Sequence, residues 1–374
     1  MKVKAAVARE GCEQFSIEEL ELGEPGPHDV LVRLAGVGLC HTDVKVLGGR
    51  MEVPKPIVLG HEGAGIVERT GSRVKTAKPG DHVVLTYDSC GACHACASGN
   101  PAYCEQTNAL NFQDARANEP GFFSKGADRI HGHFFGQSSF CTYAITRERN
   151  TIAVRTDAPL EILGPLGCSI QTGAGAIMNS LAVEQGERVA IFGVGSVGLS
   201  AVMAAAVCGC SEIVAIDALE SRLVMARQLG ATKCILAASN LKTADEVRRL
   251  LPGGVNCALD TTGRGDSYQQ AVASLGAKGR FGFVTLPAGG FEPNLATMML
   301  HGLGVRGIVQ GDSVPLTFIA HLIDLHMDGR FPFDALVTSY PLEEINQAVA
   351  DQASGKVVKP IFTPTFDAAL TSHR

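Results

Sequence analysis

The sequence lacks any apolar run of about eighteen residues, so it offers no candidate transmembrane helix. Its start also lacks an apolar core, because Glu10 and Glu13 interrupt MKVKAAVAREGCEQF; we therefore expect no signal peptide and a cytoplasmic protein. Basic clusters are missing from a chain whose net charge is −6, so neither nucleic acid nor an anionic membrane is an expected partner. The expected partners are small molecules and further copies of the chain.

Cysteine is too dilute for a disulfide scaffold, since 12 are spread over 374 residues. A reducing compartment would keep such thiols available as metal ligands. Internal repeats and low-complexity segments are also missing. Half of the cysteines stand scattered, mostly among apolar residues, and are predicted to be small buried side chains: Cys12, Cys141, Cys208, Cys210, Cys234 and Cys257.

The order of apolar segments predicts two domains, which the length of 374 residues also favours. Up to about residue 165, short segments such as DVLVRLAGVG, EGAGIVERTG, GDHVVLTY and FCTYAIT predict an antiparallel β domain. From about Arg188, strands such as RVAIFGV and EIVAID alternate with helical stretches, which is typical of a parallel sheet. We therefore predict an α/β protein with one domain in residues 1–169 and 312–374, interrupted by a dinucleotide-binding domain in residues 170–311.

Four cysteines stand close together within CGACHACASGNPAYC: Cys90, Cys93, Cys96 and Cys104. This spacing lets four thiolates converge on one tetrahedral metal. Four thiolates fill every position that zinc offers in a closed site, so no place is left for water or substrate. The quartet is therefore expected to be structural, and the chemistry should lie elsewhere.

The stretch VAIFGVGSVGLSAVMAAAV predicts a dinucleotide site, because strand, glycine turn, helix, second strand and terminal acid follow in order. Gly193 permits a tight turn, Gly195 lets the backbone approach a pyrophosphate, and Gly198 allows the helix to pack closely on the strand. Asp217 can accept hydrogen bonds from the ribose hydroxyls and would repel a 2′-phosphate, which favours NAD over NADP. Arg222 either flanks the adenine or is a solvated helix charge.

A second set of metal ligands is predicted from GVGLCHTD and VLGHEGAGIV. Cys40 and His61 suit zinc and cannot belong to the saturated quartet. Cys168, just before the dinucleotide-binding domain, is the best candidate by position for a third ligand. Each residue alone is more often buried core, so the prediction depends on the set. Two thiolates and one imidazole would leave the fourth position open, as catalysis requires.

These motifs, in this order over essentially the whole chain, resemble the zinc-dependent medium-chain alcohol dehydrogenases, whose GHE motif matches Gly60–Glu62. The resemblance implies a mostly-β GroES-like catalytic domain and a doubly wound Rossmann domain. It implies a structural zinc on the quartet and a catalytic zinc on Cys40, His61 and Cys168, with Glu62 as a nearby or transient ligand. Asp43 resembles the acid that orients the ligating histidine.

The resemblance also assigns roles beyond the metal ligands. Thr42 resembles the hydroxyl that hydrogen-bonds the alcohol and passes its proton outward. Lys359 matches a position that reaches the cofactor pyrophosphate, although an exposed lysine near a carboxyl-terminal strand is a comparable alternative. Val197 and Thr172 complete the expected NAD contacts.

One departure from the resemblance concerns the end of the proton relay. Many relatives carry a histidine five residues after the zinc cysteine, where this chain has Lys45. A lysine with an ordinary pKa is protonated at neutral pH and cannot act as a base. A desolvated Lys45, His41 or water remains as the terminal base; we expect water, and we expect His41 to face the cofactor phosphates or solvent.

Within the family, ILGPLGCSIQTGAGA, ALNF and FFGQSSFCTYAI resemble the branch that oxidises aryl (benzyl-type) and allylic (geraniol) alcohols to aldehydes. A planar substrate needs an apolar slot. The residues expected to line it, each of which could instead be simple core, are Met51, Leu110, Phe140 and Leu286.

Other functions are compatible with parts of this pattern. A glutathione-dependent formaldehyde dehydrogenase or a general alcohol dehydrogenase would share both zinc sets, while a non-enzymatic NAD-binding protein would have an incomplete open set. The segment from Cys104 to Phe140 could lengthen a lid or an interface. An edge strand from about residues 256–310 is expected to pair with another subunit, giving a homodimer or homotetramer.

Overall fold

A computed structural model describes residues 1–116, 119, 121–238, 242–286, 288 and 290–365 of the chain. The chain divides into two compact units. Unit 1 contains residues 1–168, 314–324 and the chain from Asp334 onward, and unit 2 contains residues 169–313 and 325–333. The stretch Leu325–Phe333 therefore belongs to unit 2, whereas the sequence analysis predicts that all of residues 312–374 belong to the first domain. The boundary between the units at residues 324 and 325 falls within one helix, Pro315–Met327.

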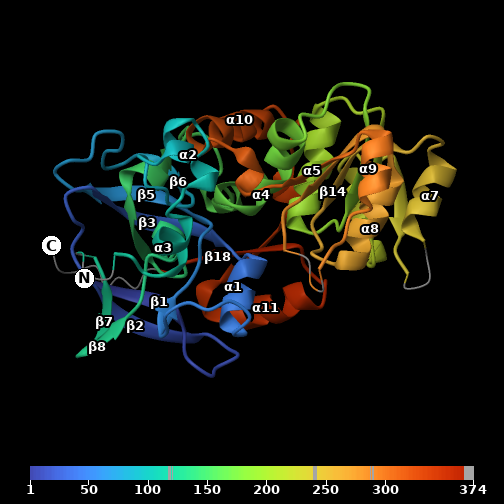
Figure 1. Ribbon diagram of the computed structural model, residues 1–374. Coiled ribbons are helices and arrows are strands. Elements are labelled where there is room, and N and C mark those ends of the chain that lie inside the picture. The colour runs from blue at the N-terminus through green and yellow to red at the C-terminus, as the bar shows by residue number, and fades with distance from the viewer. Residues whose placement is uncertain (117–118, 120, 239–241, 287, 289, 366–374) are drawn as a thin grey trace. The chain divides into compact units, whose positions relative to one another are not determined.

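Unit 1 is built mainly from two sheets (Figure 1). The first has the order β4-β1-β2-β7-β8, with β1 Lys2–Ala8, β2 Ser16–Leu22, β4 Ile57–Val58, β7 Phe123–Lys125 and β8 Asp128–Ile130. The second has the order β10-β6-β5-β3-β18-β17, and β9 also pairs with β3. Its bounds are β3 Asp29–Gly38, β5 Gly63–Thr70, β6 His82–Leu85, β9 Tyr143–Arg147, β10 Thr151–Ala153, β17 Val337–Pro341 and β18 Lys359–Thr363.

Strand β3 is the centre of unit 1, as its sequence DVLVRLAGVG predicts. Eight of its ten residues are buried, because it pairs with β5, β9 and β18 and packs on both faces. The antiparallel pairing with β18 brings Lys359 beside the end of β3, where the Leu39 N–H donates to Pro360 O at 2.9 Å. A segment more than 300 residues away in sequence thus reaches the first ligand loop.

Unit 2 contains a parallel sheet in the order β13-β12-β11-β14-β15-β16, as the alternation of strands and helices predicts. The bounds are β11 Arg188–Phe192, β12 Glu212–Asp217, β13 Lys233–Leu236, β14 Val255–Asp260, β15 Leu275–Phe283 and β16 Gly304–Gly307. Its core packs around Val214, Ala258 and Tyr268. Strands β11 and β12 lie side by side, so the ends that carry Gly193 and Asp217 meet at one edge of the sheet.

Helices connect these strands, and Figure 1 shows their order along the chain. Their bounds in unit 1 are α1 His41–Leu47, α2 His94–Ala97, α3 Thr107–Phe112 and α11 Ile345–Ala353. In unit 2 they are α4 Ser169–Gly175, α5 Ser196–Val207, α6 Glu220–Gln228, α7 Thr243–Leu250, α8 Gly265–Ser274 and α9 Leu295–His301, and α10 Pro315–Met327 contains the division. Among the described residues, none of the helices combines the length and apolarity needed to cross a membrane. Of the scattered cysteines, Cys141 and Cys257 are buried as predicted, whereas Cys208, Cys210 and Cys234 are only partly buried. Cys12 is exposed, contrary to the prediction, because it lies in the turn that follows β1.

Candidate metal and cofactor sites

The quartet of cysteines forms a compact set whose sulfur atoms all lie within 4.8 Å of one another. The Sγ atoms of Cys90 and Cys96 are 3.9 Å apart, and those of Cys93 and Cys104 are 4.0 Å apart. A regular tetrahedron with Zn–S bonds of about 2.3 Å has edges of about 3.8 Å, so the spacing fits a zinc ion. The quartet therefore has the geometry of a closed metal site.

Backbone N–H groups donate to sulfur atoms of the quartet, while burial raises the pKa of the Cys96 thiol to about 12 and also raises that of Cys104. The N–H groups of Ala92 and Cys93 donate to Cys90 Sγ at 3.4 and 3.2 Å, and they lower the pKa of this thiol to about 6. Cys104 Sγ accepts from the N–H groups of Cys90 and Gln106 at 3.2 and 3.4 Å. Hydrogen bonds to a thiolate stabilise its charged form, which is the form that binds metal.

The second set brings Cys40, His61, Glu62 and Cys168 together, with ligand atoms within 4.8 Å of one another. All four residues belong to unit 1 but come from three separate segments. Cys40 precedes α1, His61 and Glu62 lie between β4 and β5, and Cys168 follows the turn 164–167. No local spacing joins these segments; the pairing of β3 with β5 brings the first two together.

Asp43 organises the second set. Its Oδ2 accepts from the Cys40 N–H at 3.1 Å, and its Oδ1 accepts from the Gly60 N–H at 3.1 Å and from His61 Nδ1 at 3.0 Å. His61 Nε2 is consequently directed away from Asp43, is buried, and has no hydrogen-bond partner among the described residues. A buried imidazole nitrogen without a partner beside two thiols fits a metal ligand, because an unsatisfied polar atom is otherwise costly.

The thiols and the imidazole influence one another. A hydrogen bond from Cys168 and the neighbouring His61 hold the pKa of Cys40 well below its ordinary value against the effect of burial. Cys40 and burial hold the pKa of Cys168 well above its ordinary value. Burial opposes a charged His61, but Asp43 and Cys40 outweigh it and raise the pKa of the imidazole.

Glu62 is held by Lys359 within this set. Lys359 Nζ donates to Glu62 Oε2 at 2.9 Å, to Glu62 Oε1 at 3.1 Å and to Leu39 O at 2.9 Å, and its side chain is 1% exposed. Burial raises the pKa of Glu62, while Lys359 opposes this shift. The exposed lysine of the alternative interpretation is therefore wrong: the strand pairing of β18 buries Lys359 beside the metal set. Its contact with a cofactor pyrophosphate stays a prediction.

Thr42 lies in helix α1, close to the second set of ligands. The Thr42 hydroxyl is 3.7 Å from Cys40 Sγ, in the first turn of α1. His41 is exposed and Lys45 is half-buried on the same short helix. The proximity of Thr42 to the ligand set is the arrangement that its predicted role requires, and the proton transfer itself stays a prediction.

An aromatic cluster that the sequence analysis missed surrounds the histidine ligand. The Phe135 ring stacks on the His61 imidazole with centroids 4.2 Å apart and planes 17° apart, and Phe134 meets it edge-on at 5.5 Å. Phe112 packs edge-on against Phe135 at 5.0 Å. The pair of phenylalanines in HGHFFG was the available signal, but only the fold shows that it faces His61.

The structure places Phe140 in the core, and the roles of the other slot residues, Met51, Leu110 and Leu286, stay predictions. Phe140 is completely buried between the ring edges of Phe15 and Phe362 at 5.6 and 5.5 Å, so it is core. Met51 also packs against the core. Leu286 belongs to unit 2, where it is 86% exposed.

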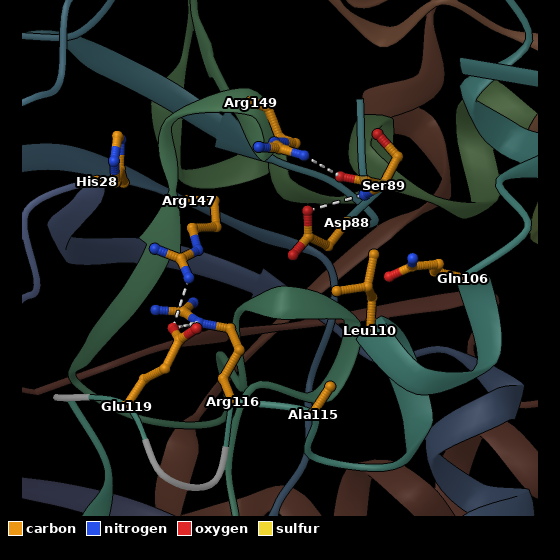
Figure 2. A pocket seen from close by; sticks show the side chains of 10 residues that line it. All are labelled: His28, Asp88, Ser89, Gln106, Leu110, Ala115, Arg116, Glu119, Arg147 and Arg149. Carbon is orange, nitrogen blue, oxygen red and sulfur yellow. Dashed lines mark hydrogen bonds and ion pairs between the residues drawn. The ribbon is translucent and has the colours of Figure 1, made fainter. Parts of the chain in front are cut away.

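Leu110 lines a polar pocket of about 400 Å³ in unit 1, shown in Figure 2. Three arginines and two acids share this pocket; the Arg149 Nη1 donates to Ser89 O, and Glu119 accepts from Arg116 and Arg147. Its full lining is His28, Asp88, Ser89, Gln106, Leu110, Ala115, Arg116, Glu119, Arg147 and Arg149. The role of Leu110 in a substrate slot stays a prediction.

The glycine turn of unit 2 has the geometry expected of a dinucleotide site. Gly193 directly follows β11 and has a φ of +82°, and a Cβ on Gly198 would lie 1.9 Å from Gly193 O, so neither position tolerates a side chain. Gly195 precedes α5, and a Cβ built there would meet no atom within 4 Å. The backbone is therefore open to a phosphate group at the beginning of α5. Val197 is half-buried in the first turn of that helix.

Asp217 ends β12 beside this turn. Its Oδ2 accepts from the Val194 N–H at 2.8 Å and its Oδ1 from the Leu219 N–H at 3.0 Å, so the carboxylate is fixed next to the glycines. Arg222 Nη1 lies 3.7 Å from Asp217 Oδ2, which gives the arginine an ion-pair partner. Thr172, in α4, donates to Gln310 Oε1 at 3.3 Å. The contacts of these side chains with a cofactor stay predictions.

Known proteins resemble the chain over nearly its whole length. Residues 26–156 match the family described as alcohol dehydrogenase GroES-like domain, and residues 196–326 match the family described as zinc-binding dehydrogenase. The geraniol dehydrogenase of Castellaniella defragrans is 41% identical over 364 residues, covering 96% of this chain and 97% of that protein.

Two solved structures are similarly close. An alcohol dehydrogenase zinc-binding domain protein from Burkholderia ambifaria is 50% identical with a TM-score of 0.94, covering 98% of this chain and 100% of that one. The benzyl alcohol dehydrogenase of Acinetobacter calcoaceticus is 41% identical with a TM-score of 0.91, again covering 98% of this chain and 100% of that one.

Proposed function

The chain belongs to the zinc-dependent medium-chain alcohol dehydrogenases, and from that premise we propose that it oxidises primary aryl (benzyl-type) or allylic alcohols to aldehydes with NAD, reversibly. Membership in the family confirms the predicted fold class, a GroES-like domain with a Rossmann domain, and the predicted oxidoreductase activity. The names of the geraniol and benzyl alcohol dehydrogenases support the substrate class for this chain.

Two zinc ions per chain are part of the proposal. Support comes from the two donor sets, one a closed quartet of thiols and the other two thiols with an imidazole. Zinc at the second set would supply a Lewis acid that lowers the pKa of an alcohol hydroxyl. Asp43 holds His61 by Nδ1 so that Nε2 remains the ligand atom, and Lys359 holds the Glu62 carboxylate.

The side chains around the second set position the substrate and its proton. The Thr42 hydroxyl, 3.7 Å from Cys40 Sγ, accepts a hydrogen bond from the alcohol and donates onward toward solvent. Phe134 and Phe135 cover the His61 ring and exclude water from that side. With Lys45 half-buried on α1, water completes the relay in this proposal.

NAD supplies the hydride acceptor, and the turn from Gly193 to Gly198 supports its binding in unit 2. The open backbone at Gly195 would receive the pyrophosphate, and Asp217 would accept from the adenosine ribose. The fixed carboxylate of Asp217 would repel a 2′-phosphate, which is why we propose NAD rather than NADP. Kinetics with both cofactors test this choice, and a preference for NADP would contradict it.

The observation that carries the substrate class is the aromatic cluster of Phe112, Phe134 and Phe135 at the histidine ligand. Aromatic faces and edges favour contact with a planar conjugated group over a short aliphatic chain. The test is a panel of benzyl, cinnamyl, geranyl and short aliphatic alcohols, followed by NADH absorbance. Higher kcat/KM for ethanol than for benzyl alcohol would refute the assignment.

The same panel separates the alternatives. A clear preference for S-(hydroxymethyl)glutathione would identify a formaldehyde dehydrogenase instead, and equal rates on all alcohols would identify a general alcohol dehydrogenase. Metal analysis tests the two-zinc proposal separately, because one zinc per chain would mean that the second set does not hold metal.

We also propose a homodimer or homotetramer in the cytoplasm. Strand β16 is at the edge of the parallel sheet among the described residues, and helix α9, which precedes it in the chain, exposes Leu295, Met299 and Leu300 by 73–77%. Exposed apolar side chains and an edge strand suit a second copy of the chain. A stable monomer in sedimentation at micromolar concentration would contradict this. The reduced thiols of two metal sets suit a reducing compartment such as the cytoplasm.

A further inference from the structure

Gln137 is a buried amide whose hydrogen-bonding capacity is fully used. Its Nε2 donates to His61 O at 3.0 Å and to Thr86 O at 3.2 Å, and its Oε1 accepts from the Gly63 N–H at 3.1 Å and from Ser139 Oγ at 2.7 Å. A glutamine side chain offers two donor hydrogens and two acceptor lone pairs, so these four bonds satisfy it completely. The residue is 1% exposed, which makes each of these bonds costly to lose.

The partners of Gln137 are the backbone groups on either side of Glu62. His61 O and the Gly63 N–H belong to the residues before and after it, so a single side chain clamps the loop that carries His61 and Glu62. Small movements of this backbone would move the imidazole, whose other end is held through Nδ1 to Asp43.

The same amide connects this loop with the third ligand segment through Thr86. Thr86 O accepts from Gln137, and Thr86 Oγ1 donates to Gly167 O at 2.8 Å, one residue before Cys168. Hydrogen bonds therefore connect the backbone of His61, through Gln137 and Thr86, with Gly167, the residue before Cys168. Both Thr86 and Gln137 are almost completely buried, so solvent does not compete for these bonds.

The backbone around Gln137 is held in a costly conformation. Phe135 and Ser138 have φ values of +51° and +53°, a left-handed region that side chains other than glycine rarely adopt. Ser138 Oγ donates to Val58 O at 2.6 Å and accepts from the Phe134 N–H at 2.9 Å, which fixes the segment. Strain of this kind persists where the surroundings require one geometry, and it is concentrated at functional sites.

We propose that Gln137 is a positioning residue for the open metal set, which keeps the loop of His61 and Glu62 in register with the segment that ends at Cys168. The inference rests on the proposed zinc chemistry but goes beyond it, because Gln137 contacts neither a ligand atom nor the substrate. Loss of such supporting groups weakens metal binding by about 10- to 100-fold in comparable sites.

The test is Gln137→Met, which keeps the length of the side chain and removes all four hydrogen bonds. Zinc affinity is measured by chelator competition, with the quartet of the same chain as an internal reference. The visible spectrum of the cobalt(II)-substituted open set reports the ligand geometry. The matched control is Gln171→Met, since Gln171 is likewise a buried glutamine, accepts from Ser313 Oγ at 2.8 Å and lies in unit 2.

We expect Gln137→Met to lose zinc from the open set at about 10- to 100-fold lower chelator concentration and to shift the cobalt spectrum, with the quartet unchanged. We expect Gln171→Met to leave both readouts as in the wild type. A Gln137→Met protein that is less stable but has wild-type zinc affinity and spectrum would overturn the inference, because its role would then be structural only.

A second variant guards against a Gln137→Met protein that does not fold. Thr86→Val is nearly isosteric and removes the hydrogen bond to Gly167 O, so it should weaken zinc binding at the open set in the same direction. Wild-type affinity and spectrum in Thr86→Val would then overturn the inference. Failure of the proposed function is seen separately, as a wild-type protein that binds a single zinc or oxidises no alcohol.

Discussion

The buried ion pair between Lys359 and Glu62 allows one quantitative prediction. The two side chains are 1% and 0% exposed and 2.9 Å apart, and Lys359 also donates to Leu39 O. Lys359→Met keeps the aliphatic stem and removes the charge. Glu62 would then remain buried as a carboxylate without its cation, beside the thiol of Cys40.

The magnitude follows from the geometry and the burial. At 2.9 Å and an effective dielectric constant of about 20, the attraction is about 6 kcal/mol, and desolvation of both groups offsets much of it. Removing one partner of such a pair costs about 3–5 kcal/mol because the other charge stays buried. The double variant Glu62→Gln with Lys359→Met contains neither charge, so its loss should be smaller than the sum of the single losses by about 2–3 kcal/mol.

The assay is urea unfolding of the four proteins with saturating zinc, followed by circular dichroism because the chain contains no tryptophan. The transition of unit 1 is fitted separately from that of unit 2, since two units need not unfold in one step. A loss below about 1 kcal/mol for Lys359→Met, or additive losses in the double variant, would refute the reasoning that the pair is buried and coupled.

Three further predictions concern the quartet, the aromatic cluster and acid stability. Cys104→Ser should leave one zinc per chain and lower the melting temperature; two zinc ions by metal analysis would contradict a four-thiolate site. Phe135→Leu should lower kcat/KM for benzyl alcohol by about 2- to 12-fold, equivalent to about 0.5–1.5 kcal/mol, without changing that for ethanol, and equal losses would argue against substrate contact. Arg9 holds the pKa of Glu18 at about 2, with Lys125 contributing, so Glu18 stabilises the fold above its ordinary pKa of 4.5 and loses this effect as the pH falls through about 2. At pH 7 the free energy of unfolding of Glu18→Gln should therefore be about 1–2 kcal/mol below that of the wild type, a value that includes solvent screening of the half-exposed cations. Unfolding measured over a pH series should show this difference vanish near pH 2, and a difference that stays constant with pH would contradict the linkage.

The features that the sequence predicts correctly are those whose partners are close along the chain. Strand β3 coincides with DVLVRLAGVG, and the turn at Gly193 lies between β11 and α5 as its pattern indicates. The quartet lies within fifteen residues, so its spacing alone indicates convergence. Each of these depends on local backbone geometry, which residue order determines directly.

The features that sequence reasoning missed depend on strand pairing across long separations. Lys359 is buried against Glu62 only because β18 returns to pair with β3, and no local pattern indicates that contact. The sequence indicates Phe140 for the slot, whereas Phe135, five residues earlier, stacks on His61. Phe135 has a left-handed φ, and a hydrophobic pattern does not indicate such a backbone conformation.

The segment 133–138 gives the open metal set both its support and its aromatic wall. Phe135 stacks on one face of His61, while Gln137, two residues later, binds the carbonyl of the same histidine. The wall and the metal support therefore depend on the same strained backbone. The change in zinc affinity of the double variant Phe135→Leu with Gln137→Met should accordingly differ from the sum of the two single changes. Additive effects in the chelator assay would show that the wall and the support are independent, and that the strain at Phe135 serves the substrate alone.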